Sequence, residues 1–163
     1  MTPDIRESTA DDADDIVYLL DAAMLDFDRE RVRRRVGEGD VLVAVDTAGE
    51  VVGACVLCVV DDGAVEGDGD VIAAADIGGS EAKPTEIESI AVRRSRRGHG
   101  IGRALVDAAA ARAAVPLVAR FREQVRPFYA ALGFEIRRVG GAKQEGDGDA
   151  GPDAGDRLCG ILK

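Results

Sequence analysis

The stretch "TEIESIAVRRSRRGHGIGRALVDAA", residues 85–109, decides the fold of this chain. Its first eight residues are rich in β-branched and apolar side chains and predict a strand, whereas "RALVDAAAARAA" (103–114) consists of strong helix formers. Gly98, Gly100 and Gly102 stand between the two elements. Alternating glycines allow a tight turn that brings backbone N–H groups close to a ligand, and a helix start adds about half a positive charge. The stretch therefore predicts a phosphate-binding turn in an α/β fold.

The spacing of these glycines distinguishes three kinds of phosphate-binding loop. A Walker A loop requires Gly-Lys, which this stretch lacks, and a dinucleotide fingerprint requires a third glycine where Arg103 stands. The residues fit R-x-x-G-x-G instead, with Arg97, Gly100 and Gly102 at the defined positions. The alternative is a plain strand-to-helix turn whose arginines serve solubility.

Hydrophobic periodicity and turn residues predict the remaining elements. We expect strands at 3–8, 41–46, 51–60, 116–121, 134–140 and 157–163, and helices from a Ser8 or Thr9 cap to residue 24, at 28–36 and at 126–132. Two acidic, Gly-rich segments are expected to be connections: 61–83, in which 70–76 is a candidate frayed strand, and 141–156. This order describes one mixed α/β domain, residues 1–163, with a central sheet.

The chain is acidic, with 31 Asp and Glu residues against 21 Lys and Arg and a formal net charge of -10. Only Lys83, Lys143 and Lys163 are lysines, and such surfaces resemble those of proteins from salt-accumulating halophiles. An acidic field that docks a cationic substrate is the alternative. Because this surface would repel a phosphate backbone, we expect no nucleic-acid partner. Without a leader or an apolar run of about 20 residues, we expect a cytoplasmic protein with no membrane partner.

The three cysteines give little support to a redox or metal site. Cys55 and Cys58 form a C-x-x-C in an apolar segment, but residues three apart on a strand point to opposite faces. Together with Cys159 they are expected in the core. With one histidine and no second cysteine pair, the chain is expected to bind no metal.

With these motifs the chain resembles the GNAT superfamily of acyl-CoA-dependent N-acetyltransferases. The family's pyrophosphate signature is Q/R-x-x-G-x-G/A between a strand ending like I-A-V and a helix, and residues 87–109 match all of it. A second signature, N-x-x-A-x-x-F-Y-x-x-x-G-F, is met by "REQVRPFYAALGFE" (122–135), except that Arg122 and Val125 replace the asparagine and the alanine. The two signatures occur in the family's order, and the likeness covers essentially the whole chain.

The resemblance implies a GNAT-type mixed, mostly antiparallel central sheet flanked by helices, and acetyl-CoA as the acyl-donor cosubstrate. It assigns cofactor contacts to the end of the strand, the glycine turn and the second signature: Ile90, Ala91, Val92, Arg97, Gly98, His99, Gly100, Ile101, Gly102, Arg103, Arg122 and Phe128. His99 is expected on the solvent side, near the phosphates, and not as a base. A polar contact from the replaced asparagine to the pantetheine arm is not implied.

The chemistry requires a base, because an amine must be neutral to attack a thioester and a lysine-like amine has a pKa of about 10.4. Glu86 and Glu88 lie two residues apart, on one face of the predicted strand, where the resembling enzymes often hold their base. We lean to Glu88, and solvent-facing carboxylates are the alternative. The family implies that a backbone N–H near Ile90 to Val92 stabilises the oxyanion and that Tyr129 is the general acid. A core aromatic is the alternative for Tyr129.

The amine acceptor is the least constrained part of the prediction. The resemblance implies acetylation of a primary amine, on a small molecule or a peptide, by direct attack in a ternary complex. Acidic residues in the first two helices, in 61–83 and in the last hairpin would favour a cationic amine. Tyr18 is a candidate to line this pocket, although we expect it to pack. A catalytically inactive CoA-binding regulatory module is the alternative function, and a homodimer through the late strands is in keeping with the family.

Overall fold

The computed structural model describes residues 3–23, 27–59, 85–113, 117–138 and 157–162. Its strands are β1 (Asp4–Glu7), β2 (Val41–Val45), β3 (Val51–Val59), β4 (Thr85–Val92), β5 (Leu117–Arg122), β6 (Glu135–Arg138) and β7 (Arg157–Leu162). Its helices are α1 (Ala13–Ala22), α2 (Arg29–Glu38), α3 (Ile101–Ala113) and α4 (Arg126–Ala131), with 3-10 helices at Ala10–Asp12, Arg94–Arg96 and Glu123–Val125. The segments expected at 61–83 and 141–156, and the candidate strand at 70–76, lie outside the described residues.

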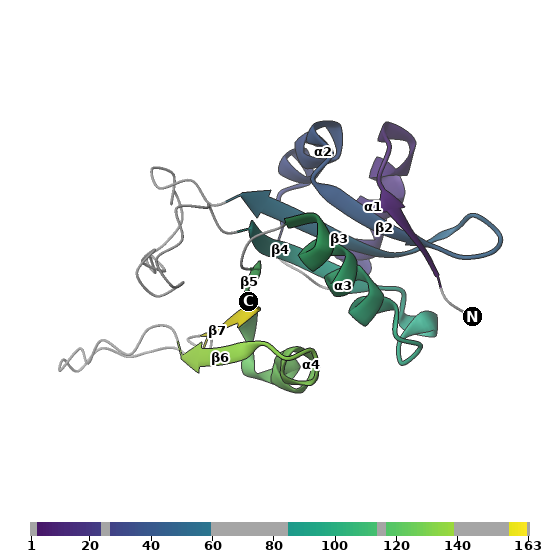
Figure 1. The fold of residues 1–163 in the computed structure, drawn as a ribbon. Helices are drawn as coiled ribbons and strands as arrows, with labels where there is room; N and C mark the ends of the chain where they lie inside the picture. The colour runs from purple at the N-terminus through teal and green to yellow at the C-terminus, as the bar shows by residue number, and fades with distance from the viewer. Residues whose placement is uncertain (1–2, 24–26, 60–84, 114–116, 139–156, 163) are drawn as a thin grey trace, which may run out of the picture.

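All seven strands form one sheet in the order β1-β2-β3-β4-β5-β7-β6 (Figure 1). Neighbouring strands are antiparallel except β4 and β5, which are parallel. A parallel pair needs a crossover connection, and α3 supplies it between β4 and β5. The mixed, mostly antiparallel sheet predicted from the sequence is confirmed.

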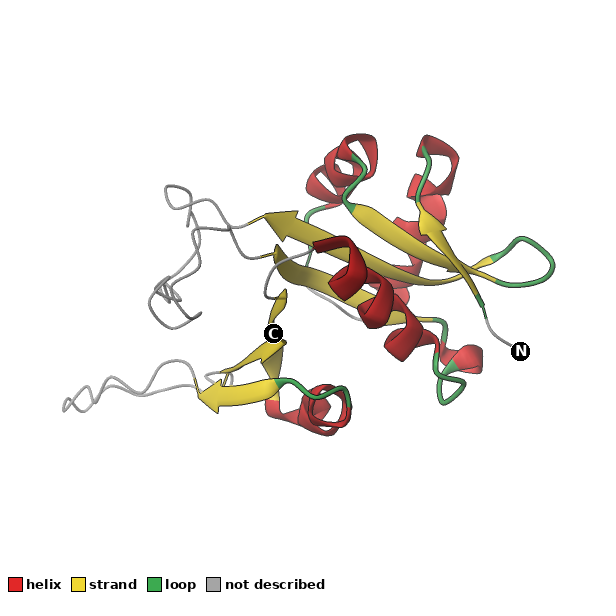
Figure 2. Cartoon of the chain, in the orientation of Figure 1, coloured by secondary structure: helices red, strands yellow, loops and turns green. Residues whose placement is uncertain are grey.

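Helices cover both faces of the sheet (Figure 2). α1 and α2 pack on one face, where their buried residues form an apolar cluster with Val41 and Val43 of β2. α3 packs on the other face, where Leu105 and Val106 form a cluster with Leu42. Successive side chains of β2 therefore pack on opposite faces of the sheet, as the two-residue period of a strand requires.

A β-bulge in β4 changes the direction of its side chains. Consecutive residues of β3 pair with Ser89 and Ile87, so Glu88 has no residue opposite it on β3. An extra residue of this kind bends a strand and re-aims the side chains beside it. Ile87 and Ile90, three residues apart, accordingly pack against the same apolar cluster.

The first helical segment begins at Thr9 and not at Ser8. The Asp12 carboxylate accepts hydrogen bonds from the N–H of Thr9 at 2.8 Å and from its hydroxyl at 3.1 Å. Arg6 donates to the same carboxylate at 2.7 Å, and this bond is the main reason that the pKa of Asp12 falls to about 2. Ser8 is buried, and its hydroxyl has no hydrogen-bond partner within the described structure. The segment is thus anchored to β1 through an ion pair.

The packing predicted for Tyr18 is wrong, since this side chain is 72% exposed. At about 100° per residue, position 18 of α1 lies opposite the helix face that the sheet buries. That buried face consists of Ile16, Val17, Leu19 and Leu20.

Cys55 and Cys58 point to opposite faces of β3, as predicted. Cys55 is fully buried in the cluster under α3, whereas the Cys58 sulfur accepts a hydrogen bond from Arg35 of α2 at 2.9 Å. The core prediction is confirmed for Cys55 and Cys159, which are buried, and is wrong for Cys58, which is half-buried. Cys58 lies near the end of β3, where an arginine and not an apolar side chain covers it.

None of the helices in the described part of the chain combines the length and the apolar character that crossing a bilayer requires.

Candidate active site

The glycine turn, residues 97–102, connects β4 to α3 in a conformation that requires glycine at two positions. Gly98 has a φ of +82° and Gly100 a φ of +78°, a region that costs other residues about 1 kcal/mol or more. Arg97 folds back on the turn, where its Nε donates to the carbonyl of Val92 at 3.2 Å. The first arginine of the motif therefore stabilises the turn itself.

Two further arginines attach this segment to the β2–β3 hairpin. Arg93 pairs with Glu50 at 3.1 Å, and Arg96 pairs with Asp46 at 3.2 Å. Asp46 also accepts hydrogen bonds from two backbone N–H groups of the hairpin turn, so it is held in place. These contacts hold the segment that precedes the glycine turn against the hairpin.

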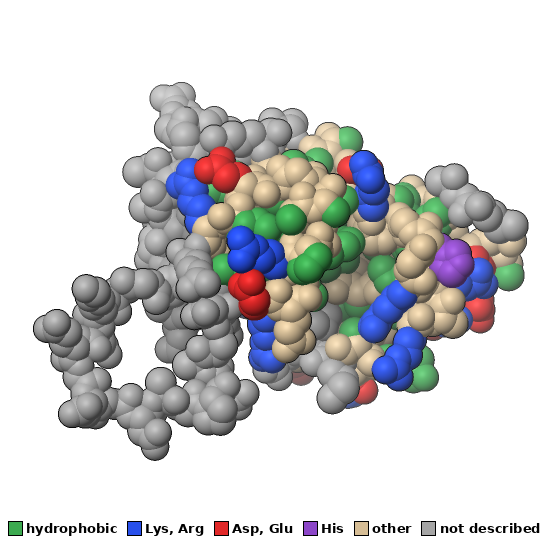
Figure 3. Space-filling view, turned by 90° about the horizontal axis from the view of Figure 1, so that it is seen from below, with side chains coloured by type: hydrophobic (Ala, Val, Ile, Leu, Met, Phe, Trp, Pro, Cys, Tyr) green, Lys and Arg blue, Asp and Glu red, His purple; other side chains and the backbone are tan. Residues whose placement is uncertain are grey.

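His99 lies on the surface of the same turn, as predicted. Its Nδ1 is 3.1 Å from the carbonyl oxygens of both Arg96 and Arg97. Both partners are acceptors, so Nδ1 must be the protonated nitrogen. Figure 3 shows the chain's one histidine exposed on the face seen from below, with basic side chains nearby. The geometry assigns His99 to holding the turn, and Nε2 remains for an external partner.

The start of α3 presents free backbone donors. The carbonyl of Gly100 accepts the first helical bond, from the N–H of Ala104 at 3.0 Å. The N–H groups of Ile101, Gly102 and Arg103 find no acceptor among the described residues. A cluster of free N–H groups at a helix start favours an anion.

Gly102 brings the two sequence signatures into contact. A β-carbon at this position would lie 3.0 Å from Cε2 of Phe128, so glycine lets α4 approach α3 closely without a shift of the ring. Phe128 is half-buried against the cluster under α3, and Arg122 is exposed at the end of β5. Arg94 and Arg103 are exposed and form no ion pair with the described residues.

Beyond its first residues, β4 has a free edge. β4 and β5 pair only at Thr85–Ile87, opposite Leu117–Ala119. Residues 89–92 pair with β3 on one side, and residues 88–92 pair with no described strand on the other. Alternate N–H and C=O groups of this segment, which includes Ile90, Ala91 and Val92, therefore face away from β3 without a ladder partner.

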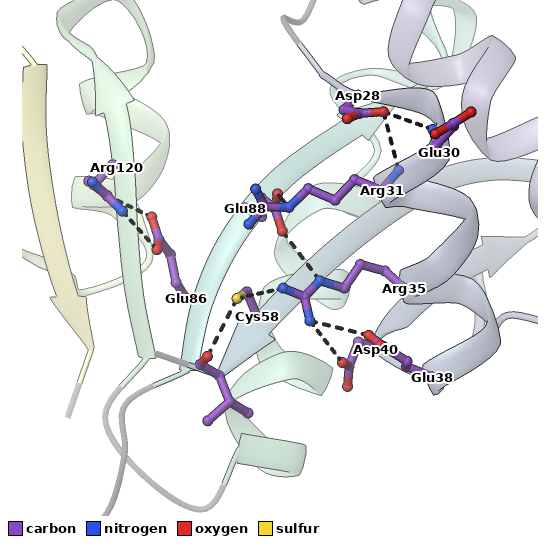
Figure 4. Close-up of polar contacts among 11 residues, drawn as sticks. Asp28, Glu30, Arg31, Arg35, Glu38, Asp40, Cys58, Glu86, Glu88 and Arg120 are labelled. Atoms are coloured by element: carbon purple, nitrogen blue, oxygen red, sulfur yellow. Dashed lines mark hydrogen bonds and ion pairs between the residues drawn. The ribbon is translucent and has the colours of Figure 1, made fainter. Parts of the chain in front are cut away.

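The two candidate bases lie on the α2 face of β4 but have different partners (Figure 4). Arg120 of β5 donates to both oxygens of Glu86, at 2.7 and 3.0 Å. This bidentate pair bridges β4 and β5 at the last paired residues before the strands separate. Both Glu86 oxygens are thus engaged, and its side chain is 15% exposed.

Glu88 lies between two arginines of α2 (Figure 4). Arg31 Nε is 2.6 Å from Glu88 Oε1, and Arg35 Nε is 3.7 Å from Glu88 Oε2. Oε2 and Arg35 Nε are both buried atoms without a hydrogen-bond partner in the described structure. Oε2 of Glu88 therefore accepts no hydrogen bond in the described structure, although it lies within ion-pair distance of Arg35, whereas both oxygens of Glu86 are hydrogen-bonded.

Tyr129 is buried, with 4% of its surface exposed. Its ring stacks on Phe121 at 4.1 Å between centroids and meets Phe128 and Phe134 edge-on. Burial raises the pKa of the Tyr129 phenol well above its ordinary value, so the group stays protonated across the physiological range. Tyr129 is therefore a core aromatic, and its role as the general acid stays a prediction.

Sequence reasoning missed the arginines that contact the glutamates. Arg31, Arg35 and Arg120 belong to elements that the sequence placed correctly, but no motif includes them. The only signal was the run of five arginines in "RERVRRRVGE", which holds two of the three.

The sequence profile of the acetyltransferase (GNAT) domain matches residues 37–136, more than half of the chain. The chain belongs to the GNAT acetyltransferase family. Members of this family generally use acetyl-CoA as the cosubstrate. The matched region runs from the end of α2 to β6 and contains the glycine turn, both glutamates and Tyr129.

Solved structures share the fold of this GNAT acetyltransferase at low sequence identity. NAA60 of Arabidopsis thaliana has a TM-score of 0.71 and 17% identity, with 99% of this chain and 97% of that chain covered. Ard1 of Thermoplasma volcanium has a TM-score of 0.69, 17% identity and the same coverages. A GNAT-family acetyltransferase of Bacillus cereus has a TM-score of 0.68 and 14% identity, covering 100% and 98%. No curated protein sequence matches the chain.

Within the described residues of this acetyltransferase, no group of three His, Cys, Asp or Glu side chains is arranged to hold a metal ion.

Proposed function

We propose that this acetyltransferase moves an acetyl group from acetyl-CoA to a primary amine by direct attack in a ternary complex. The observation that carries the proposal is the placement of Glu88, at the bulge of β4 where the unpaired edge begins, with one oxygen that accepts no hydrogen bond in the described structure. A base and free backbone donors on one short segment are what acyl transfer to an amine requires.

The donor is proposed to bind at the glycine turn. The free N–H groups at the start of α3 suit a diphosphate, and the open conformation of Gly98 and Gly100 lets a ligand approach the backbone. Exposed Arg103 and Arg122 are candidates for charge-assisted contacts to phosphate. From this turn the acyl end of the coenzyme would extend along the unpaired edge of β4.

Glu88 is the better candidate for the base. Glu86 already accepts two hydrogen bonds from Arg120, whereas Oε2 of Glu88 accepts none in the described structure. Glu88 would take a proton from the ammonium, directly or through a water, and the neutral nitrogen would form the new C–N bond. Glu86 would instead hold β5 against β4 where the two strands separate.

The remaining steps need an oxyanion donor and a proton for the leaving group. A backbone N–H of residues 90–92 would stabilise the oxygen of the tetrahedral intermediate. When the C–S bond breaks, the coenzyme leaves as a thiolate, and Tyr129 would donate the proton. Two relatives support direct transfer, since NAA60 of Arabidopsis thaliana and Naa20 of Chaetomium thermophilum have each been solved in complex with a bisubstrate analogue.

The test combines binding with turnover. Acetyl-CoA should raise the melting temperature, and free CoA thiol should appear when an amine from a broad panel is added. Tyr129→Phe should bind acetyl-CoA with the affinity of the wild type. Its rate of thiol release should be lower by about tenfold or more. If CoA raises the melting temperature but no amine gives thiol release, the chain is a CoA-binding module and not an enzyme.

A further inference from the structure

Each carboxylate of the charged cluster around Glu88 lies within ion-pair distance of a guanidinium. This cluster consists of Arg31, Arg35, Glu38, Asp40, Glu86, Glu88 and Arg120 (Figure 4). Arg120 binds Glu86, and Arg35 Nη1 lies 3.3 Å from Glu38 and 3.6 Å from Asp40. Glu88 has Arg31 and Arg35 on its two oxygens. Every described carboxylate of the cluster already faces a guanidinium.

The charged group of this cluster that remains open to a ligand is the guanidinium of Arg31. This side chain contacts Glu88 through Nε, and its two terminal nitrogens donate no hydrogen bond within the described part of the chain. It is 44% exposed. Arg35, one helical turn later, uses Nη1 for Glu38 and Nη2 for Cys58 and is 16% exposed. Among the described arginines of this cluster, Arg31 alone presents two terminal NH₂ groups without a hydrogen bond beside the candidate base.

A free guanidinium fork selects for planar anions. Its parallel N–H groups match the two oxygens of a carboxylate, which gives a strong, directional, bidentate contact. A dication such as a polyamine would instead bring a second ammonium close to Arg31 without a vacant carboxylate to receive it. The chemistry beside Glu88 therefore disfavours the purely cationic acceptor that the acidity of the chain suggested.

We infer that the acceptor is an amine that also carries a carboxylate close to its amino group, and that Arg31 is the residue that selects it. This inference rests on the proposed function of Glu88 as the base. The acceptor's carboxylate binds the terminal nitrogens of Arg31, which places the amino group beside Glu88. Arg31 then shares its charge between two carboxylates, so its hold on Oε1 of Glu88 weakens as the ammonium arrives.

Two kinds of molecule carry an amino group close to a carboxylate: a free amino acid, and a peptide whose N-terminal residue is acidic. The experiment measures thiol release with three sets of probes: L-amino acids, the same amino acids as α-amides, and short peptide amides that begin with Asp or Glu. Faster turnover of free acids than of their amides identifies a free amino acid. Turnover of the acidic peptides at a similar rate identifies the peptide N-terminus.

The variants are Arg31→Gln, Arg31→Lys and, as the control, Arg33→Gln. Arg33 lies on the same helix and pairs with Asp14 on the surface at 3.3 Å, so its loss removes one charge of α2 without touching Glu88. We expect the wild type to favour carboxylate-bearing over amidated acceptors about tenfold or more in kcat/KM. Arg31→Gln should abolish this ratio, Arg31→Lys should keep part of it, and Arg33→Gln should leave it unchanged.

Equal rates in the wild type for acceptors with and without a carboxylate, or a preference that survives in Arg31→Gln, would overturn the inference. Failure of the proposed function gives a different result, namely no thiol release with any probe. In that case calorimetric titration of the amino acids and their amides into the CoA complex still decides the matter. Tighter binding of the acids that is lost in Arg31→Gln supports selection by Arg31, and equal or absent binding refutes it.

Discussion

The two regions proposed to hold the substrates use different chemical groups. The glycine turn offers backbone N–H groups and two residues with positive φ, all within six consecutive positions. The cluster around Glu88 consists of side chains from α2, β4 and β5 and of Asp40, joined by ion pairs, and its first and last members are more than eighty residues apart in the chain. The glycine turn is thus a local site formed by the main chain. The cluster around Glu88 is formed by charged side chains that are distant from one another in the sequence.

This difference indicates where specificity resides. Any sequence that keeps the glycines can keep the donor site, because amides are common to all residues. The acceptor side depends on which charged side chain occupies each of a few positions, and each can change without disturbing the fold. The following predictions separate the two regions, from the largest effect to the smallest.

Glu88→Gln should lower kcat by roughly a hundredfold or more, because an amide cannot take the proton from the ammonium. Affinity for acetyl-CoA should not change, since Glu88 lies outside the glycine turn. Glu86→Gln is the matched comparison on the same strand face, and it should retain most of kcat while weakening the bridge to Arg120. Steady-state thiol release at saturating acetyl-CoA measures both. The reverse ranking would make Glu86 the base.

Gly100→Ala should weaken acetyl-CoA binding by about tenfold, because alanine resists positive φ and shifts the N–H groups. Gly49→Ala is a control with the same cost of folding. Gly49 and Gly100 have φ values of +82° and +78°, and neither has an atom within 4 Å of an added β-carbon. Urea unfolding should show equal destabilisation of about 1 kcal/mol, with calorimetry showing weaker binding in Gly100→Ala alone. Equal affinities in the two variants would remove the glycine turn from the donor site.

Asp12→Asn tests an arginine–carboxylate pair outside both regions. The pKa of Asp12 is about 2 in the folded chain and near 3.9 when unfolded, so the charged carboxylate contributes on the order of 2 kcal/mol to folding at neutral pH. This contribution is complete above about pH 4 and is lost as the pH falls through about 2.

Urea unfolding of wild type and Asp12→Asn between pH 2 and pH 7 measures this difference. The two curves should converge toward acid pH, and acetyl-CoA affinity at neutral pH should be the same. A constant gap at all pH values would contradict the ionic origin of the stabilisation.

Salt should act with opposite signs on folding and on donor binding. With a net charge of -10, screening should stabilise the fold by about 1 kcal/mol and raise the melting temperature by about 2–4 °C. The same screening should weaken the contacts between arginines and the coenzyme's phosphates. Melting curves and acetyl-CoA titrations from 0.1 to 2 M NaCl provide the measurement. Affinity that rises with salt would argue against an electrostatic donor site.

The sequence predicted the elements because their signals are local. Hydrophobic periodicity placed the described strands and helices, and the glycine spacing predicted the turn before α3. It erred where neighbours in space decide the environment. Tyr18 lies on the outer side of α1, and Cys58 is covered by Arg35 instead of by apolar side chains.

For this chain the order of helices and strands, the glycine turn and the two glutamates on one strand face were determined by the sequence alone. All of these depend on spacings of a few residues. Only the tertiary structure decided which glutamate keeps an oxygen without a hydrogen bond and which arginine is open to a ligand. Ion pairs such as those of Glu88 with Arg31 and of Glu86 with Arg120 arise from the packing of α2 and β5 beside β4. No local pattern records such pairs, because the energy of a charge depends on its neighbours in space and not on its neighbours in the chain.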